Sequence, residues 1–208
     1  MVSKMTNHYY TQNPDVVHEE RHWPFTLLGN ELLFTTDNGV FSKSRVDYGS
    51  CALLNAFEAD QTPAGPWLDL GCGYGPIGLA LAKRWPDRQV TMADVNELAL
   101  SLAQQNATAN QITNVTIVES DRYAALGTQR YAAILTNPPV RAGKAVVTSM
   151  LTEAAQHLLP GGTLTVVLQK KQGAPSAKKT MTATFGNCQI LKKDKGYYIL
   201  ESRQNASS

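Results

Sequence analysis

Short hydrophobic segments alternate with segments of helical periodicity through the central part of the chain. Strands are expected near residues 67–70, 89–94, 115–119, 131–136 and 162–169, and helices near residues 76–84, 96–109 and 144–158. Strands and helices that alternate in this way form right-handed βαβ units, in which helices cover both faces of a parallel sheet. The pattern therefore predicts an α/β fold with a doubly wound, mostly parallel sheet.

The beginning of the chain predicts a small antiparallel extension to this sheet. Hydrophobic residues on both sides of Gly29-Asn30 indicate a β-hairpin with strands at 23–28 and 31–36. Residues 47–57 then have a helix-forming composition, with Asp47 or Ser50 as the N-cap.

The last part of the chain departs from the alternation. Residues 176–185 have a helical pattern, and two strands at 189–193 and 197–201 flank the turn signature Asp194-Lys-Gly196. We therefore expect the sheet to finish in a C-terminal antiparallel hairpin.

Length and composition agree with one domain. A chain of 208 residues that is 43% hydrophobic can bury one substantial core. We expect a single domain over residues 1–208, with residues 1–60 as the hairpin and helix extension and residues 61–208 as the core. No apolar segment approaches the length of a membrane span, and the first residues show no targeting pattern. Three cysteines without paired spacing are typical of reduced thiols, so a cytoplasmic location is expected.

Charge is distributed unevenly along the chain, although the net charge is only +2. Residues 1–140 contain 9 Lys and Arg against 14 Asp and Glu, whereas residues 141–208 contain 10 against 3. A basic final third is consistent with a polyanionic partner such as RNA, and equally consistent with a lysine-rich solvated surface.

A glycine-rich loop follows the strand at 67–70. The sequence Gly71-Cys-Gly-Tyr-Gly75 leads into Pro76 and an apolar helix, an arrangement in which glycines let a ligand approach the backbone. The segment Gly73–Gly78 also satisfies the dinucleotide pattern G-x-G-x-x-G, and Asp94 lies at the distance expected for a ribose-binding acid. The loop predicts a Rossmann-like site for a nucleotide cofactor, and NAD remains an alternative at this point.

A second motif, Asn137-Pro-Pro-Val140, follows the buried strand at 131–136. It is expected at the carboxyl edge of the sheet, where ligands bind in open α/β folds. The side-chain oxygen of Asn137 and the carbonyl of Pro138 are able to accept the two hydrogens of an amino group. A conjugated amine is a poor nucleophile, and such contacts orient it and favour a pyramidal nitrogen.

These motifs resemble those of a known family. Asp69, two residues before Gly71, completes Asp-x-Gly-x-Gly-x-Gly, which resembles the first motif of class I S-adenosylmethionine-dependent methyltransferases. The strings Asn137–Lys144 and Gly39–Ser50 resemble the methyltransferase small-domain family, which includes bacterial 16S rRNA guanine-N2 methyltransferases. The resemblance runs from about Phe41 to the final hairpin.

The resemblance implies a set of site residues and S-adenosylmethionine as the cofactor. Asp94 would bind the ribose hydroxyls and Asp121 the adenine amino group. The full set of implied cofactor-binding residues is Asp69, Gly71, Cys72, Gly73, Gly75, Asp94, Val95, Ser120, Asp121 and Asn137. The implied catalytic residues are Asn137, Pro138, Pro139 and Val140.

The implied substrate is an exocyclic amino group of RNA, most simply guanine N2 of 16S rRNA. Adenine and glutamine methyltransferases of this group resemble Asn-Pro-Pro-Tyr or Asn-Pro-Pro-Phe, in which the aromatic ring stacks on the target. Val140 provides no such ring, which disfavours adenine N6 as the acceptor. Phe41, Arg141, Lys144, Lys170 and Lys171 are the expected substrate-binding residues, with Lys178 and Lys179 extending the basic rim. Adenine N6, a protein glutamine and a small molecule stay open as acceptors, as do an NAD-dependent oxidoreductase and a noncatalytic RNA-binding module.

Three further features are interpreted as structural. His18-Glu-Glu-Arg-His22 matches the zinc-protease pattern H-E-x-x-H, but Pro24 argues against a long helix and no third ligand is evident, so no metal site is expected. His157 is expected at a helix C-terminus, where its charge would be favourable. Tyr197 and Tyr198 are expected to pack the terminal strands.

Overall fold

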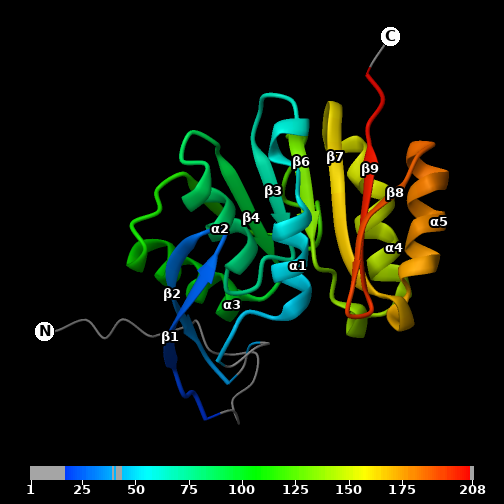
Figure 1. Ribbon diagram of the computed structural model, residues 1–208. Helices are drawn as coiled ribbons and strands as arrows, with labels where there is room; N and C mark the ends of the chain where they lie inside the picture. Colours follow the sequence, from blue (N-terminus) through cyan, green and yellow to red (C-terminus); the bar gives the residue numbers. More distant parts are fainter. Residues whose placement is uncertain (1–16, 39, 41–43, 207–208) are drawn as a thin grey trace, which may run out of the picture.

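The computed structural model describes residues 17–38, 40 and 44–206, and a seven-stranded sheet forms its centre (Figure 1). The strand order is β5-β4-β3-β6-β7-β9-β8. The strands are β3 (Trp67–Leu70), β4 (Val90–Asp94), β5 (Val115–Glu119), β6 (Tyr131–Thr136), β7 (Leu158–Gln169), β8 (Gln189–Asp194) and β9 (Tyr197–Arg203). The pairs β3·β4, β3·β6, β4·β5 and β6·β7 are parallel, which confirms the doubly wound, mostly parallel sheet.

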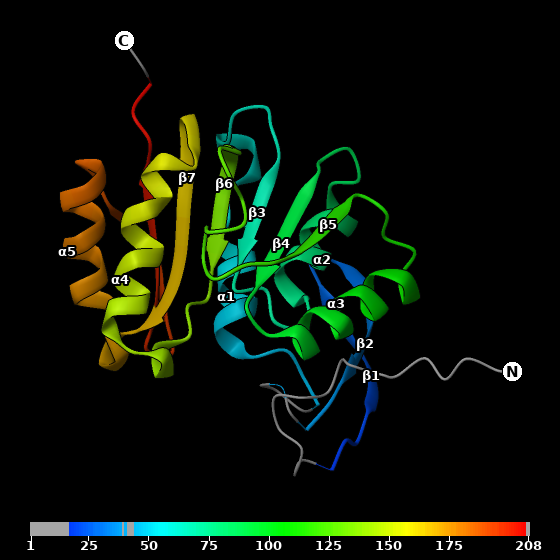
Figure 2. The same ribbon diagram turned by 180° about the vertical axis from the view of Figure 1, so that it is seen from behind.

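Helices cover both faces of this sheet. They are α1 (Tyr48–Ala56), α2 (Pro76–Arg84), α3 (Glu97–Ala109), α4 (Lys144–Thr152) and α5 (Ala174–Phe185). Residues of α1, α2 and α3 pack into one hydrophobic cluster, and residues of α4 and α5 pack into a second. Figure 1 shows α1 in front of the sheet, and Figure 2, from behind, shows α4 in front of it.

The C-terminal hairpin is present, and its second strand enters the sheet. β9 pairs antiparallel with both β7 and β8, so β8 becomes the edge strand. The turn residues Lys195 and Gly196 both have positive φ, at 45° and 81°. A two-residue turn of this kind matches the twist of the flanking strands. Lys192 and Lys193 are exposed on the edge strand, where charge opposes edge-to-edge association.

The helix expected at 144–158 was too long. α4 ends at Thr152, a 3-10 helix η4 (Glu153–Gln156) follows, and β7 already begins at Leu158. Pro160 disfavours helical backbone in the residue before it. His157 lies at a helix C-terminus, as the C-cap of η4, but it is buried there and its ring stacks on Tyr123 with centroids 4.7 Å apart.

The N-terminal hairpin consists of β1 (Arg21–Leu27) and β2 (Asn30–Thr36). Leu27 pairs with Asn30, so the turn residues are Leu28 and Gly29, one position earlier than expected. Both have positive φ, at 50° and 79°, as a type I′ turn requires.

Asn106 of α3 and Asn110, the C-cap of that helix, attach this hairpin to the core. Asn106 accepts from Thr35 N at 2.6 Å and donates to Thr35 O at 3.1 Å and to Tyr74 O at 2.9 Å. Asn110 accepts from Leu33 N at 2.8 Å and donates to Leu33 O at 2.7 Å. A two-stranded hairpin is marginal by itself, so these side chains stabilise β2 by pairing its free backbone edge.

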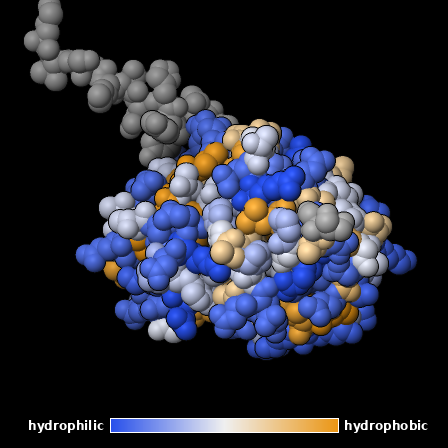
Figure 3. Space-filling model, turned by 90° about the horizontal axis from the view of Figure 1, so that it is seen from above, coloured by the Kyte–Doolittle hydropathy of each residue, from blue (hydrophilic) through white to orange (hydrophobic). Residues whose placement is uncertain are grey.

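The end of the sheet opposite the carboxyl ends of β3, β4, β6 and β7 is shown in Figure 3. Its surface is mostly hydrophilic, with separate small hydrophobic areas. Among the residues that the structure describes, no helix has the length and apolar character needed to cross a lipid bilayer.

Candidate active site

A cavity of about 710 Å³ opens at the carboxyl ends of the parallel strands. It lies where the strand order reverses between β3 and β6, the usual ligand position in this kind of sheet. Its volume is in the range of small-molecule sites. Of the residues predicted from the sequence, those that line it are Gly71, Cys72, Gly73, Asp94, Val95, Ser120, Asp121, Asn137, Pro138, Pro139, Val140 and Arg141.

The glycine loop is bound to the end of β4. The N–H groups of Gly71 and Cys72 donate to Ala93 O at 2.8 and 2.9 Å, and the N–H of Gly73 donates to Asp94 Oδ2 at 2.8 Å. A pyrophosphate would need such N–H groups as donors. Because these three are already bonded within the chain, none of them is available to bind the pyrophosphate of NAD.

Asp94 is held in a fixed orientation at the end of β4. Its Oδ2 accepts from Gly73 N, and its Oδ1 accepts from Asn96 N at 2.9 Å. Each carboxylate oxygen has a second lone pair, so both can also accept from a ligand. The neighbouring side chain of Val95 is 61% exposed and lines the cavity, where it provides an apolar wall.

Asp69 and Gly75, which the family resemblance implied as cofactor-binding residues, are not among the residues that line the cavity. Asp69 is fully buried beneath the loop and accepts from Gly78 N at 2.8 Å through Oδ2. Burial raises its pKa to about 7, opposed by the Gly78 hydrogen bond and assisted by the nearby negative charge of Asp94. Gly75 is the N-cap of α2, with a φ of 105°, and a Cβ there would lie 2.9 Å from Leu79 and Met92. Both residues support the loop from behind.

The acidic loop after β5 is organised by its own side chains. Ser120 Oγ donates to Arg122 O at 2.8 Å and accepts from Ala125 N at 3.0 Å, so this hydroxyl stabilises a turn. The carboxylate of Asp121 receives two bonds from Arg122, at 3.0 and 3.2 Å. Arg122 lines the cavity and was not anticipated from the sequence.

Asn137 lies directly after β6, between the two sides of the cavity. Its Nδ2 donates to Asp47 Oδ2 at 2.9 Å and to Ser50 Oγ at 3.1 Å. Both partners line the cavity, and the sequence had indicated them only as helix caps. The carbonyl of Pro139 accepts from Ala142 N at 2.9 Å in the 3-10 helix η3 (Val140–Ala142), so this carbonyl stabilises the turn.

The side of the cavity beyond Asn137 is formed by β7 and β9. Gln169 ends β7, and its Nε2 donates to the hydroxyl of Tyr197 at 2.9 Å. The ring of Tyr197 packs on Tyr48, with centroids 5.6 Å apart, and lies against Gly49, where a Cβ would be 3.0 Å away. Tyr197 therefore lines the cavity as well as packing the terminal strands, whereas Tyr198 packs within the second cluster.

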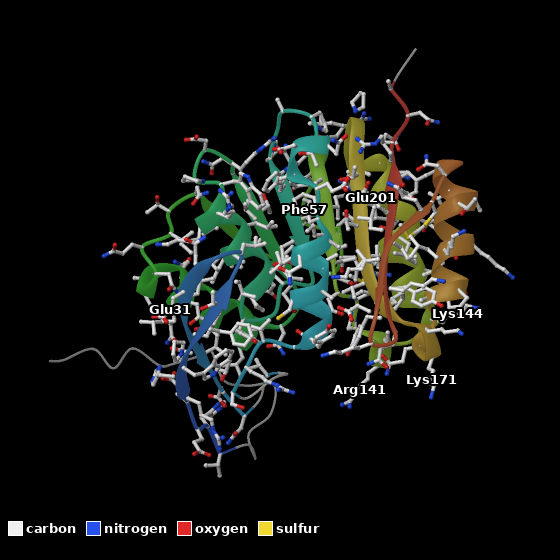
Figure 4. The ribbon with its side chains drawn as sticks, in the orientation of Figure 1. Glu31, Phe57, Arg141, Lys144, Lys171 and Glu201 are labelled. Carbon is white, nitrogen blue, oxygen red and sulfur yellow. The ribbon has the colours of Figure 1, made fainter. Side chains whose placement is uncertain are left out.

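Of the predicted basic residues, Arg141, Lys144, Lys170 and Lys171 are exposed in the segments that directly follow β6 and β7. Arg141 lines the cavity, and Figure 4 shows Arg141 and Lys171 at the same end of the molecule, with Lys144 farther up beside α5. Lys144 lines a smaller, adjacent cavity of about 290 Å³ between α4 and α5, and Lys170 and Lys171 belong to the 3-10 helix η5 (Lys170–Gln172). Lys144, Lys170 and Lys171 are not among the residues that line the larger cavity. Phe41 lies outside the described residues.

The segment matching H-E-x-x-H is not a helix. Residues 17–20 are irregular and His22 lies on β1. His18 Nδ1 lies 3.0 Å from Asp37 Oδ2, and His22 Nδ1 lies 2.9 Å from Thr35 Oγ1. The two imidazoles thus have separate contacts and do not have the helical geometry of a zinc-protease motif.

The cavity fits S-adenosylmethionine. Asp94 presents a carboxylate suited to a ribose diol, Val95 presents an apolar surface suited to an adenine face, and a Cβ on Gly73 would meet nothing within 4 Å. A cofactor without a pyrophosphate also needs none of the N–H groups that the loop has already used.

Comparison with known proteins agrees with this fit. A sheet of this order, with an acid at the end of β4 and Asn-Pro-Pro at the end of β6, is the architecture of S-adenosylmethionine-dependent methyltransferases, and the chain is a member of this class. Within the class it belongs to the methyltransferase small domain family, whose profile matches residues 31–201.

Three similar proteins place the chain within this family. YbxB, an uncharacterized protein of Bacillus subtilis, is 46% identical over 96% of this chain and 100% of its own length. Ribosomal RNA small subunit methyltransferase C of Pseudomonas aeruginosa is 31% identical over 92% of this chain and 57% of its own. The structure of the T. thermophilus 16S rRNA N2 G1207 methyltransferase, in complex with AdoMet and guanosine, has a TM-score of 0.80 at 29% identity, covering 89% of this chain and 51% of that one. The chain thus spans just over half the length of these rRNA methyltransferases.

Proposed function

We propose that this protein transfers a methyl group from S-adenosylmethionine to an exocyclic amino group of RNA, with guanine N2 of 16S rRNA as the target. The observation that carries the proposal is the fixed orientation of Asn137 at the centre of the cavity. Its NH₂ group is bound by Asp47 and Ser50, which leaves the amide oxygen to accept from an incoming amine.

Asn137 divides the cavity into two parts of different chemistry. Toward β3, β4 and β5 lie the glycine loop, Asp94 and Val95, which we assign to the cofactor. Toward β7 and β9 lie Gln169 and Tyr197, which we assign to the methyl acceptor. Neighbouring strands are about 4.8 Å apart, so an acceptor the size of a nucleobase can extend from Asn137 to Tyr197 across two strand spacings.

The acceptor side is suited to a planar, hydrogen-bonding group. Tyr197 supplies an aromatic surface, and the Gln169 amide together with the Tyr197 hydroxyl supplies polar atoms at its edge. Motifs similar to Asn137-Pro-Pro-Val140 have an aromatic residue at the fourth position, where the smaller Val140 leaves space. Tyr197 on β9 supplies the aromatic wall of the acceptor side instead. The rRNA methyltransferases to which the chain is similar include one bound to guanosine.

The residues of the chain would promote the reaction by positioning and electrostatics. When bound, S-adenosylmethionine supplies an electrophilic methyl group. The Asn137 oxygen and the Pro138 carbonyl would accept the two amine hydrogens and aim the nitrogen at that methyl group. As the new N–C bond forms and the S–C bond breaks, positive charge moves to the amine, where these oxygens stabilise it. The methylated amine then loses one proton to solvent.

The decisive experiment compares rRNA nucleosides from cells with and without the gene by mass spectrometry. We expect loss of one N2-methylguanosine and its return with the wild-type gene but not with Asn137→Ala. In vitro, labelled cofactor should mark ribosomal subunits or rRNA, and Asn137→Ala should retain S-adenosylhomocysteine binding. An unchanged nucleoside profile, with label passing to a protein or DNA fraction instead, would refute the RNA assignment.

A further inference from the structure

We infer that Asp47 is a positioning residue that fixes which end of the Asn137 amide faces the methyl acceptor. The inference deepens the proposed function and rests on it for its kinetic consequence. Its structural basis is a pair of contacts between segments that are 90 residues apart in the sequence.

The chemistry of the contact assigns the amide orientation. An ionised carboxylate only accepts hydrogen bonds, so Asp47 Oδ2, at 2.9 Å, must face the NH₂ group of Asn137. Ser50 Oγ, at 3.1 Å, accepts the second amide hydrogen. With both N–H bonds directed at α1, Oδ1 is the atom that remains for the acceptor.

The alternative orientation would disable the site. The oxygen and NH₂ group of an asparagine have nearly the same shape, so packing alone does not select between them. A reversed amide would present two donors to an amine that must donate its own hydrogens. The Asp47 carboxylate removes this ambiguity before the substrate arrives, because it cannot donate a hydrogen bond to a reversed amide oxygen.

Asp47 itself is held in place by the beginning of α1. The same Oδ2 accepts from Ser50 N at 3.0 Å and so caps the helix. The helix is anchored by the buried side chains of Leu53 and Leu54. The Asn137 amide is therefore held in place by contacts to the start of α1, a rigid helix that packs on β7.

The negative charge of Asp47 has a second effect. A carboxylate bonded to the NH₂ group polarises the amide and strengthens its oxygen as an acceptor. Positive charge develops on the amine during methyl transfer, so the carboxylate stabilises the transition state more than the ground state.

Three substitutions separate these roles from helix capping. Asp47→Ser keeps a good N-cap but is too short to reach Asn137, Asp47→Ala removes both contacts, and Asp47→Asn keeps a capping oxygen for both donors without the charge. We expect kcat to fall about 100-fold for Asp47→Ser, with an unchanged KM for the cofactor and near wild-type thermal stability. Asp47→Asn should recover a large part of kcat, and Asp47→Ala should lose stability as well as activity. Asp60→Ser, an exposed position in the 3-10 helix η2 (Ala59–Gln61), is the matched control and should change neither.

A spectroscopic measurement tests the inference without the reaction. The side-chain amide protons of Asn137, assigned by their absence in Asn137→Ala, should be shifted and slow to exchange in the wild type and in Asp60→Ser. In Asp47→Ser they should move toward the values of a solvated asparagine. If those signals are unchanged in Asp47→Ser, or if Asp47→Ser has the wild-type kcat, Asp47 does not position Asn137. If the wild type methylates no RNA but the signals respond as described, the proposed substrate fails and the positioning contact stands.

Discussion

The backbone N–H of Gly78 donates a 2.8 Å hydrogen bond to Asp69, and this bond links the first turn of α2 to a fully buried carboxyl group on β3. The other oxygen, Oδ1, has no hydrogen-bond partner among the described residues. Gly78 has no side chain for a steric reason, because a Cβ there would lie 2.6 Å from Met92. One buried acid thus supports the whole glycine loop from below.

This arrangement predicts an unusual dependence of stability on pH. Burial raises the pKa of Asp69 to about 7, whereas an unfolded aspartate titrates near 3.9. Between these values the folded protein holds one more proton than the unfolded chain, so the free energy of unfolding should fall as pH rises, by about 1.4 kcal/mol per pH unit from this group. Asp69→Asn should remove this component. Urea unfolding of both proteins at several pH values from 5 to 8 checks it, and parallel curves would show that Asp69 is already ionised in the folded state.

Asp94 should determine the affinity for the cofactor, and Asp121 much less. Asp94→Ala removes the carboxylate that faces the glycine loop, and we expect S-adenosylhomocysteine to bind at least about 10-fold more weakly by calorimetry. Asp121 is already bonded to Arg122, so Asp121→Ala should have a smaller effect. Equal losses in the two variants would contradict the assignment of Asp94 to the ribose. Thermal unfolding without ligand controls for damage to the fold.

Tyr197 should affect the methyl acceptor and not the cofactor. Removing an aromatic surface that stacks on a base costs about 1–3 kcal/mol, so Tyr197→Ala should raise the KM for RNA by about 10-fold or more. Tyr197→Phe keeps the ring but loses the hydroxyl that binds Gln169, and should have an intermediate KM. The KM for S-adenosylmethionine should stay constant in both. If the KM for S-adenosylmethionine changes and the KM for RNA does not, Tyr197 lies on the cofactor side.

The basic residues at the carboxyl end of the sheet should make RNA binding depend on salt. Arg141→Ala and Lys171→Ala should each lower the slope of log affinity against log salt concentration by about 1, if each contacts one phosphate. Lys83 is the matched control, since it lies in the last turn of α2, away from the cavity. Lys83→Ala should leave the slope unchanged. Binding that is insensitive to salt in the wild type would remove the basic rim from the interface.

Much of the fold follows from local patterns in the sequence. The strands β3 to β7 and helices α2 and α3 were predicted to within a few residues, because hydrophobic periodicity reflects which face of an element is buried. The end of α4 was not, since the stacking of His157 on Tyr123 joins segments that are distant in sequence. The place of β9 between β7 and β8 was not predicted either, because a hairpin signal indicates that two strands pair but not which of them joins the sheet.

The site, like the fold, contains residues that local sequence patterns predict and residues that they do not. Asp94, Asn137 and the glycine loop follow directly from strand ends, where topology determines their position. Asp47, at the N-cap of α1, and Tyr197, on β9, also reach the cavity, but neither follows the end of a parallel strand, so the strand-end rule does not predict them. The sequence signal that includes Asp47 is the string Gly39–Ser50, which resembles the methyltransferase small-domain family. Tyr197 pairs with Gln169 in register, but that register is known only once β9 is placed.

The position of β9 has a consequence for the order in which the cavity is completed along the chain. β9 follows β8 in the sequence but lies between β7 and β8 in the sheet, so β7 has an unpaired edge until β9 joins it. A nascent chain that ends at β8 already contains the glycine loop and Asn137, but it lacks Tyr197. The wall on which we place the methyl acceptor is therefore the last part of the cavity to be built.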